Sequence, residues 1–108
     1  MIFHGKRNNK KNTVSVTVDN KPLPTYLKYC NHSPDGFNWG YGGSGPSQLA
    51  FAILYHYTKD RDLVWRLHHN FKNEYVAGWE DEWQITSAEI QAFINNQKDL
   101  AKKVNSWT

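Results

Sequence analysis

A glycine-rich segment followed by an uncharged, strongly apolar stretch constrains this chain more than any other feature of its sequence. The glycine-rich segment, WGYGGSGP, occupies residues 39–46, and residues 47–57 after it contain no acidic residue, lysine or arginine. Proline is favoured at the first position of a helix, where its missing N–H would have no partner in any case. A helix that is apolar on nearly every face is buried on nearly every face. The sequence therefore predicts a central buried helix over residues 46–58, entered through a tight turn.

A small antiparallel sheet is expected before this helix, from the strands and turns of residues 13–38. Residues 13–18 alternate valine with polar residues, which is the pattern of a half-buried strand. Pro22 and Pro24 cannot donate sheet hydrogen bonds, so their segment can form only an edge strand or an extended return. Residues 2–4 can pair with the valine strand, and residues 26–29 can form another short strand. The pattern predicts two to four short strands.

Two further helices are expected in the second half of the chain. Apolar residues recur every fourth position within residues 61–77, which indicates an amphipathic helix. Thr86 and Glu89 form a capping box, in which each side chain can bond the backbone N–H of the other, and this predicts a helix over residues 87–104. Residues 79–84, which contain three acidic residues, are expected as a loop. That loop can be solvated, pair with the basic N-terminal end, or neutralise a basic partner.

Strands followed by three helices indicate an α+β fold, with the small sheet packed on the helices in a single domain, residues 1–108. The net charge is +3, and residues 1–12 form a basic end that can be flexible and attract anions. No apolar run is long enough to span a bilayer, and the first residues lack the apolar centre of a signal peptide. Because Cys30 is the only cysteine and no intrachain disulfide can form, we expect an intracellular protein.

The glycine-rich turn is the candidate ligand site. Successive backbone N–H groups at a helix N-terminus form a concave donor surface, and the helix dipole makes that surface favourable for phosphate or carboxylate. Ser44 and Ser47 add hydroxyl groups, while Trp39 and Tyr41 add aromatic surface that can stack on a base. The same glycines can instead serve only to pack the backbone closely at the start of a buried helix. Both interpretations remain open at the level of the sequence.

Motifs for other chemistry are missing or incomplete in the sequence. No lysine follows the last glycine of the turn as in a P-loop, and no βαβ unit surrounds the three glycines as in a dinucleotide-binding fold. Pro46 replaces the final glycine of an esterase elbow around Ser44. The five histidines show none of the usual metal-ligand spacings, and Cys30 has only His32 as a basic neighbour. We therefore expect no catalytic residue, no cofactor and no metal ligand.

The residues around the turn resemble a known family. Residues 36–54, GFNWGYGGSGPSQLAFAIL, resemble the signature of a small uncharacterised domain family, DUF6166, and residues 71–76 and 83–90 are similar to its second and third helices. The similarity spans about residues 13–95. The resemblance implies a setting in bacteria, bacteriophages or mobile elements, and hence the cytoplasm of a bacterial cell. Small proteins of that setting often act by binding, and many counter host defences. The family itself brings no fold or activity with it.

Three functions follow from these observations. The first is a non-enzymatic binding protein that sequesters a phosphate-bearing, nucleotide-type ligand of host defence. Its phosphate would lie against Gly42, Gly43, Ser44, Gly45 and Ser47, its base between Trp39 and Tyr41, with countercharge from Arg7 or Lys6. The second is a protein–protein inhibitor of a host nuclease complex, such as a CRISPR complex, which would use exposed tryptophans and the two charged segments. The third, a structural or nucleic-acid-associated accessory protein, is disfavoured because the basic residues are few and terminal. A homodimer is also expected.

Overall fold

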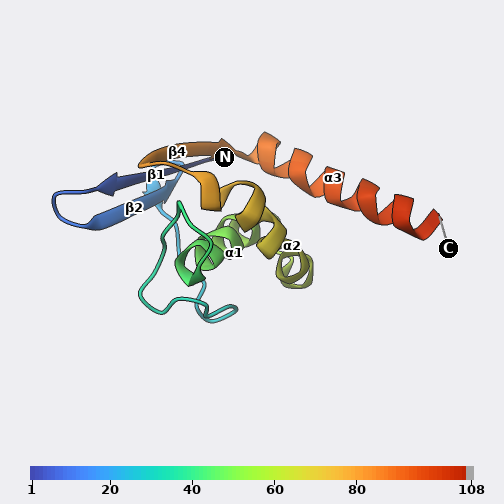
Figure 1. Cartoon of the computed structure of the whole chain (residues 1–108), viewed down its shortest axis with the longest axis horizontal. Coiled ribbons are helices and arrows are strands. Elements are labelled where there is room, and N and C mark those ends of the chain that lie inside the picture. Colours follow the sequence, from blue (N-terminus) through green and yellow to red (C-terminus); the bar gives the residue numbers. More distant parts are fainter. Residues whose placement is uncertain (107–108) are drawn as a thin grey trace.

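The computed structural model describes the backbone of residues 1–106 and the side chains of residues 1–97. It confirms the α+β fold, with a four-stranded antiparallel sheet and three α-helices (Figure 1). The strands are β1 (Ile2–Asn8), β2 (Thr13–Val18), β3 (Lys21–Pro22) and β4 (Glu82–Thr86), in the order β3-β2-β1-β4. The helices are α1 (Ser44–Thr58), α2 (Arg61–Glu74) and α3 (Ser87–Ser106), and a short 3₁₀ helix, Val76–Gly78, follows α2.

The basic N-terminal end, for which the sequence left flexibility open, contributes an inner strand of the sheet, β1. β1 pairs with β2 on one side, with Phe3 opposite Val18, and with β4 on the other, with Phe3 opposite Ile85. The expected pairing of residues 2–4 with the valine strand is thus present and continues to Asn8. The charges do not prevent this, because side chains alternate between the two faces of a strand and Lys6 takes the exposed face.

The acidic segment was only partly predicted. Its last residues belong to β4, in which Trp83 and Ile85 face the core while Glu82 and Gln84 are exposed. The alternation of apolar and polar residues from Glu82 to Ile85 indicates a strand, but the span is short. The three acidic residues beside it favoured the prediction of a loop instead. The prediction that residues 26–29 can form a short strand is also wrong. These residues form a turn in which the Tyr29 N–H donates to the Tyr26 carbonyl oxygen at 3.0 Å.

The central helix α1 is buried from Gly45 to Leu54, as its composition predicted. It begins at Ser44, two residues before the expected start, and ends where Lys59 adopts a left-handed conformation with φ of 56°. In contrast, α2 ends at Glu74 rather than at residue 77, because the chain tightens into the 3₁₀ helix.

The capping box at the start of α3 has the expected geometry. The Thr86 N–H donates to Glu89 Oε1 at 3.2 Å, and the Glu89 N–H donates to Thr86 Oγ1 at 3.3 Å. The helix starts at Ser87 as predicted and continues to Ser106, two residues beyond the expected end. Figure 1 shows α3 running away from the rest of the molecule.

One hydrophobic core joins the inner face of the sheet to the helices. Phe3, Val18 and Ile85 from the sheet are buried in the same cluster as Leu49 and Phe71 from α1 and α2. The long segment between β3 and α1 loops beside α1, to which Gln48 bonds it, and leads to the glycine-rich turn (Figure 1). None of the helices in the described part of the chain combines the length and the apolar character that crossing a membrane requires.

Candidate functional site

Two of the glycines in the turn are required by packing. Gly40 has a φ of +87°, and a Cβ atom there would lie 3.1 Å from the Trp79 carbonyl oxygen. A Cβ atom on Gly45 would lie 2.7 Å from the Cβ of Asn38. A larger residue at either position would have to displace neighbouring atoms. Close packing therefore explains Gly40 and Gly45 without any ligand.

The other two glycines are not explained in this way. A Cβ atom on Gly42 would meet nothing within 4 Å. One on Gly43 would lie 2.5 Å from Cε2 of Tyr41, so the half-exposed Tyr41 ring would have to move. Gly43 is the N-cap of α1 with an extended backbone, φ −137°, so its conformation does not demand glycine. No side chain caps the helix at this point, and its first turn contains no acidic residue. Pro46 has no N–H, so the donors at the start of α1 are the N–H groups of Ser44 and Gly45, and no side chain caps them in the described structure.

Trp39 does not form a wall of this site. It is 1% exposed, and its indole N–H donates to the Glu80 carbonyl oxygen at 2.6 Å. Its ring also packs edge-on against Trp83, with 5.6 Å between the ring centroids. The sequence could not distinguish this buried tryptophan from an exposed one, because both uses suit a large amphipathic ring. Tyr41, in contrast, is 49% exposed and lies beside Gly43.

Arg7 reaches the turn but is already bonded within the protein. Its guanidinium donates to Asn38 Oδ1 and to the Trp39 carbonyl oxygen, both at 2.9 Å, and to Asp81 Oδ1 at 3.0 Å. Lys6, the alternative source of countercharge, is the neighbouring strand residue and therefore faces the opposite side of the sheet. Arg7 is thus occupied by internal hydrogen bonds and Lys6 faces away, so neither side chain is placed to bind a phosphate at the start of α1.

Ser47 also lies inside the protein. It is 5% exposed, and its hydroxyl donates to the Gly43 carbonyl oxygen at 3.0 Å, one turn back along the helix. Of the predicted ligand-binding residues, the structure thus leaves Tyr41, Gly42, Gly43 and Ser44 accessible together at the surface.

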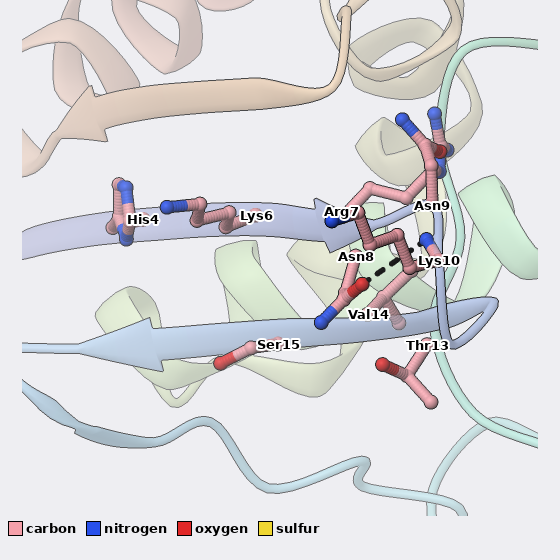
Figure 2. Close-up of a pocket in the computed structure, with 9 residues that line it drawn as sticks. All are labelled: His4, Lys6, Arg7, Asn8, Asn9, Lys10, Thr13, Val14 and Ser15. Carbon is pink, nitrogen blue, oxygen red and sulfur yellow. Dashed lines mark hydrogen bonds between the residues drawn. The ribbon is translucent and has the colours of Figure 1, made fainter.

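A shallow basic pocket lies on the β1–β2 hairpin (Figure 2). It has a volume of about 550 Å³, and Lys6, Lys10 and Ser15 are among its lining residues. The hairpin tip is ordered by Asn8, whose Oδ1 accepts the N–H of Lys10 at 3.1 Å. Three of the basic residues near the N-terminus, Lys6, Arg7 and Lys10, therefore line one pocket.

The acidic segment pairs with this basic end, one of the alternatives the sequence left open. Asp81 accepts hydrogen bonds from Asn9 and Arg7, which lower the pKa of its carboxyl group. His4 Nε2 lies 2.8 Å from Glu82 Oε1, and this hydrogen bond lowers the pKa of the Glu82 carboxyl group. The contacts tie β1 to β4 and to the segment before it.

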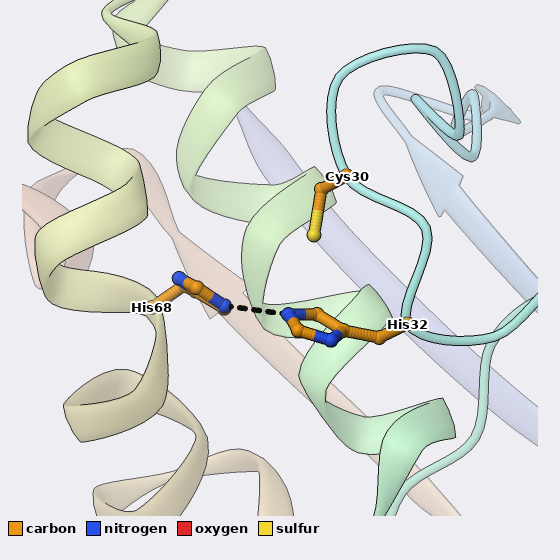
Figure 3. Close-up of side chains that lie close together, drawn as sticks. All are labelled: Cys30, His32 and His68. Atoms are coloured by element: carbon orange, nitrogen blue, oxygen red, sulfur yellow. Dashed lines mark hydrogen bonds between the residues drawn. The ribbon is translucent and has the colours of Figure 1, made fainter.

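A second group of side chains, not anticipated from the sequence, lies where α1, α2 and the preceding loop meet. Cys30, His32 and His68 each offer one ligand atom, and these three atoms lie within 4.8 Å of one another (Figure 3). The Nε2 atoms of the two histidines are 3.0 Å apart. Because His32 and His68 are far apart in the sequence, no spacing motif could reveal the cluster.

The cluster carries little charge in its present state. Burial, together with the nearby His69, lowers the pKa of His68 to about 4. Burial is also the main cause that lowers the pKa of His32 and raises the pKa of the Cys30 thiol. Two neutral imidazoles and a neutral thiol therefore lie together near neutral pH.

These features describe a small α+β domain with an uncapped helix start and a buried Cys–His–His cluster. The chain belongs to DUF6166, a family of unknown function, whose model matches residues 3–96. The match includes β1, so it begins earlier than the resemblance noted in the sequence. No curated protein matches the chain, and no solved structure does either.

Proposed function

We propose that the protein is a non-enzymatic binding protein that holds a phosphate-bearing ligand at the N-terminus of α1. The observation that supports this proposal is the uncapped start of α1 at Gly43, beside Gly42, where an added Cβ atom would meet nothing; at Gly43 it would meet only the exposed Tyr41 ring. Free N–H groups and the positive end of the helix dipole favour an anion at such a point.

The ligand site differs from the one that the sequence suggests. A phosphate would accept hydrogen bonds from the backbone around Gly43 and from the exposed Ser44, and Tyr41 would supply aromatic surface beside it. Trp39 and Arg7 would act beneath the turn, where they hold its backbone in place. A nucleotide-type ligand of host defence, bound in a bacterial cytoplasm, stays a prediction from the family resemblance.

Gly43→Asp provides a sharp test. Aspartate is a good N-cap residue, and its carboxylate would accept the Gly45 N–H, because Pro46 at the third helical position has no N–H to offer. A phosphate at the same point would need that Gly45 N–H. Compared with Gly43→Ala, which carries the same Cβ atom, Gly43→Asp should be more stable by at least about 0.5 kcal/mol, yet lose ligand binding. Gly43→Ala is the matched control, because its Cβ atom displaces the Tyr41 ring as the Cβ of aspartate does, but it brings no acceptor to the backbone N–H groups.

The measurement is the thermal midpoint, Tm, in the presence of inorganic phosphate, nucleoside triphosphates and cyclic dinucleotides. A ligand that binds only the native state stabilises it by about 2.7 kcal/mol at one hundred times its Kd. We expect at least one of these compounds to raise Tm in wild type and in Gly43→Ala, but not in Gly43→Asp. A midpoint that none of them shifts, or a shift that Gly43→Asp retains, would refute the proposal.

A protein–protein inhibitor is the second candidate, and the exposure of Trp65 favours it. This side chain on α2 is 54% exposed, and tryptophan is enriched among the residues that dominate binding energy at interfaces. Trp65→Ala should then abolish capture of the partner. Lys10→Glu combined with Lys11→Glu should weaken the interaction only if the hairpin belongs to the same surface. An unchanged interaction in the Trp65 variant would exclude that surface.

A further inference from the structure

The Cys30, His32 and His68 cluster has the donor set of a transition-metal site. A thiolate and two imidazoles are the ligands that Zn²⁺ and similar divalent ions prefer. Around a tetrahedral zinc ion, bond lengths of about 2.0–2.3 Å place such ligand atoms roughly 3.3–3.6 Å apart. The two Nε2 atoms are already 3.0 Å apart, and all three ligand atoms lie within 4.8 Å of one another. A small rotation of the side chains is enough to reach the required distances.

The hydrogen bonds of His68 direct its free lone pair into the cluster. Its Nδ1 atom lies 3.1 Å from the Val64 carbonyl oxygen and 2.9 Å from that of Trp65. A carbonyl oxygen can only accept, so Nδ1 carries the proton and Nε2 carries the lone pair. Metal-binding histidines are commonly oriented by such a bond from the other ring nitrogen. Because His68 Nε2 is an acceptor, the hydrogen bond between the two rings is donated by His32 Nε2.

The two loop ligands are held in place by one buried glutamine. Gln48 of α1 donates to the Cys30 carbonyl oxygen at 2.7 Å and accepts the His32 N–H at 2.8 Å through its amide oxygen. The backbone of both ligands is thus fixed to α1, while His68 comes from α2. A preformed arrangement of this kind lowers the cost of binding, because little conformational freedom remains to be lost.

Access to the cluster is provided by a pocket of about 500 Å³ that Cys30 and His32 line together with Arg61 and Trp65. Three protein ligands leave one position of a tetrahedral ion open to water or to another molecule. The pocket lies on the side of the two loop ligands, so that an ion could enter there and the fourth position could face it.

We propose that Cys30, His32 and His68 bind one divalent transition-metal ion of the zinc type. On binding, the Cys30 thiol releases its proton to solvent and the thiolate sulfur bonds to the metal. His32 keeps a single ring proton, which moves from Nε2 to Nδ1, and both Nε2 lone pairs then bond to the ion. The ion would fasten the loop before α1 to α2. This inference departs from the sequence, which indicated no metal ligand, and it does not depend on the proposed ligand at Gly43.

The test uses the full chain and Co²⁺ as a spectroscopic probe, followed by displacement with Zn²⁺. Tetrahedral Co²⁺ with a thiolate ligand has intense visible bands and a near-ultraviolet sulfur-to-metal charge-transfer band. We expect both to saturate at one Co²⁺ per chain, to disappear when Zn²⁺ is added, and to be accompanied by a higher Tm. Cys30→Ser should abolish the charge-transfer band, and His32→Gln should weaken Co²⁺ binding at least about tenfold.

His69→Gln is the matched control. His69 is exposed next to His68, and its ring centroid is 5.5 Å from that of His32, but it does not belong to the three-residue set. Its substitution should leave the spectrum unchanged. Wild-type protein that shows no charge-transfer band at equal concentrations of Co²⁺ overturns the proposal, as does a band that Cys30→Ser retains or His69→Gln removes. Gly43→Asp should leave Co²⁺ binding intact, so failure of one site is distinguishable from failure of the other.

Discussion

The guanidinium of Arg7 lies over the indole ring of Trp39, with its Cζ atom 4.8 Å from the ring centroid. The same group donates to the Trp39 carbonyl oxygen and to Asn38, so β1 is fastened to the segment that enters α1. A planar guanidinium can stack and donate in several directions at once, and this is what the position requires.

Replacement of Arg7 should therefore destabilise the fold. We expect Arg7→Ala to lower the free energy of unfolding by about 2 kcal/mol, because the Asn38 and Trp39 oxygens lose a charged donor and the ring loses its cation. Arg7→Lys should recover only part of this, since a point charge cannot make all these contacts. Urea denaturation measures the difference, and Lys6→Ala, at an exposed position, is the control. Equal stability of the Arg7→Ala and Lys6→Ala variants would contradict this account.

The buried amide of Gln48 should be among the most sensitive positions in the chain. It donates to the carbonyl oxygens of Thr25 and Cys30 and accepts the N–H groups of His32 and Ser33. Gln48→Leu leaves these buried backbone groups without partners, so we expect a loss of about 3 kcal/mol in urea denaturation. Gln84→Leu is the control on the exposed face of β4 and should change stability by less than about 0.5 kcal/mol. A small effect at Gln48 would mean that the loop is held by other contacts.

Gly5 is required because Trp83 packs directly on it. A Cβ atom at this position would overlap the indole ring of Trp83, with Cε2, Nε1 and Cζ2 as its nearest neighbours. The ring cannot move aside easily, because Trp79 stacks on it with 4.0 Å between the centroids. We expect Gly5→Ala to cost about 3 kcal/mol or more in urea denaturation. In a double-mutant cycle, Trp83→Leu should recover part of that loss. Strict additivity of the two substitutions would argue against direct packing.

Local patterns in the sequence were sufficient for the parts of the fold that local chemistry determines. The alternation of valines indicated β2, the uncharged run before Lys59 indicated α1, and the pairing of Thr86 with Glu89 located the start of α3. Strands β1 and β4 were harder, because each carries charged residues and gains its stability from a partner distant in the sequence.

In the candidate sites too, features set by local sequence could be predicted, whereas features set by distant contacts could not. The glycine-rich turn at a helix start was visible in the sequence, but the burial of Trp39 depends on contacts with Glu80 and Trp83 that only the fold creates. The meeting of Cys30 with His68 likewise depends on how the loop lies against α2. Single residues that converge from separate elements leave no spacing that a reader of the sequence could recognise.

The hydrogen bonds of Asp81 should make the fold sensitive to acid. Asn9 and Arg7 hold the pKa of this carboxyl group below its ordinary value of 3.8, so the folded state keeps the charge at a pH where the unfolded chain begins to bind a proton. The stabilisation is complete well above pH 3.8 and is lost as the pH falls through the lower pKa of the folded state. Asp81→Asn removes this contribution, so the difference in stability between wild type and variant should shrink as the pH falls from about 6 to about 3. Urea denaturation across this range, at constant ionic strength, measures that difference. A gap between the two proteins that stays constant or widens in acid would show that the Asp81 charge does not stabilise the link between the hairpin and the segment before β4.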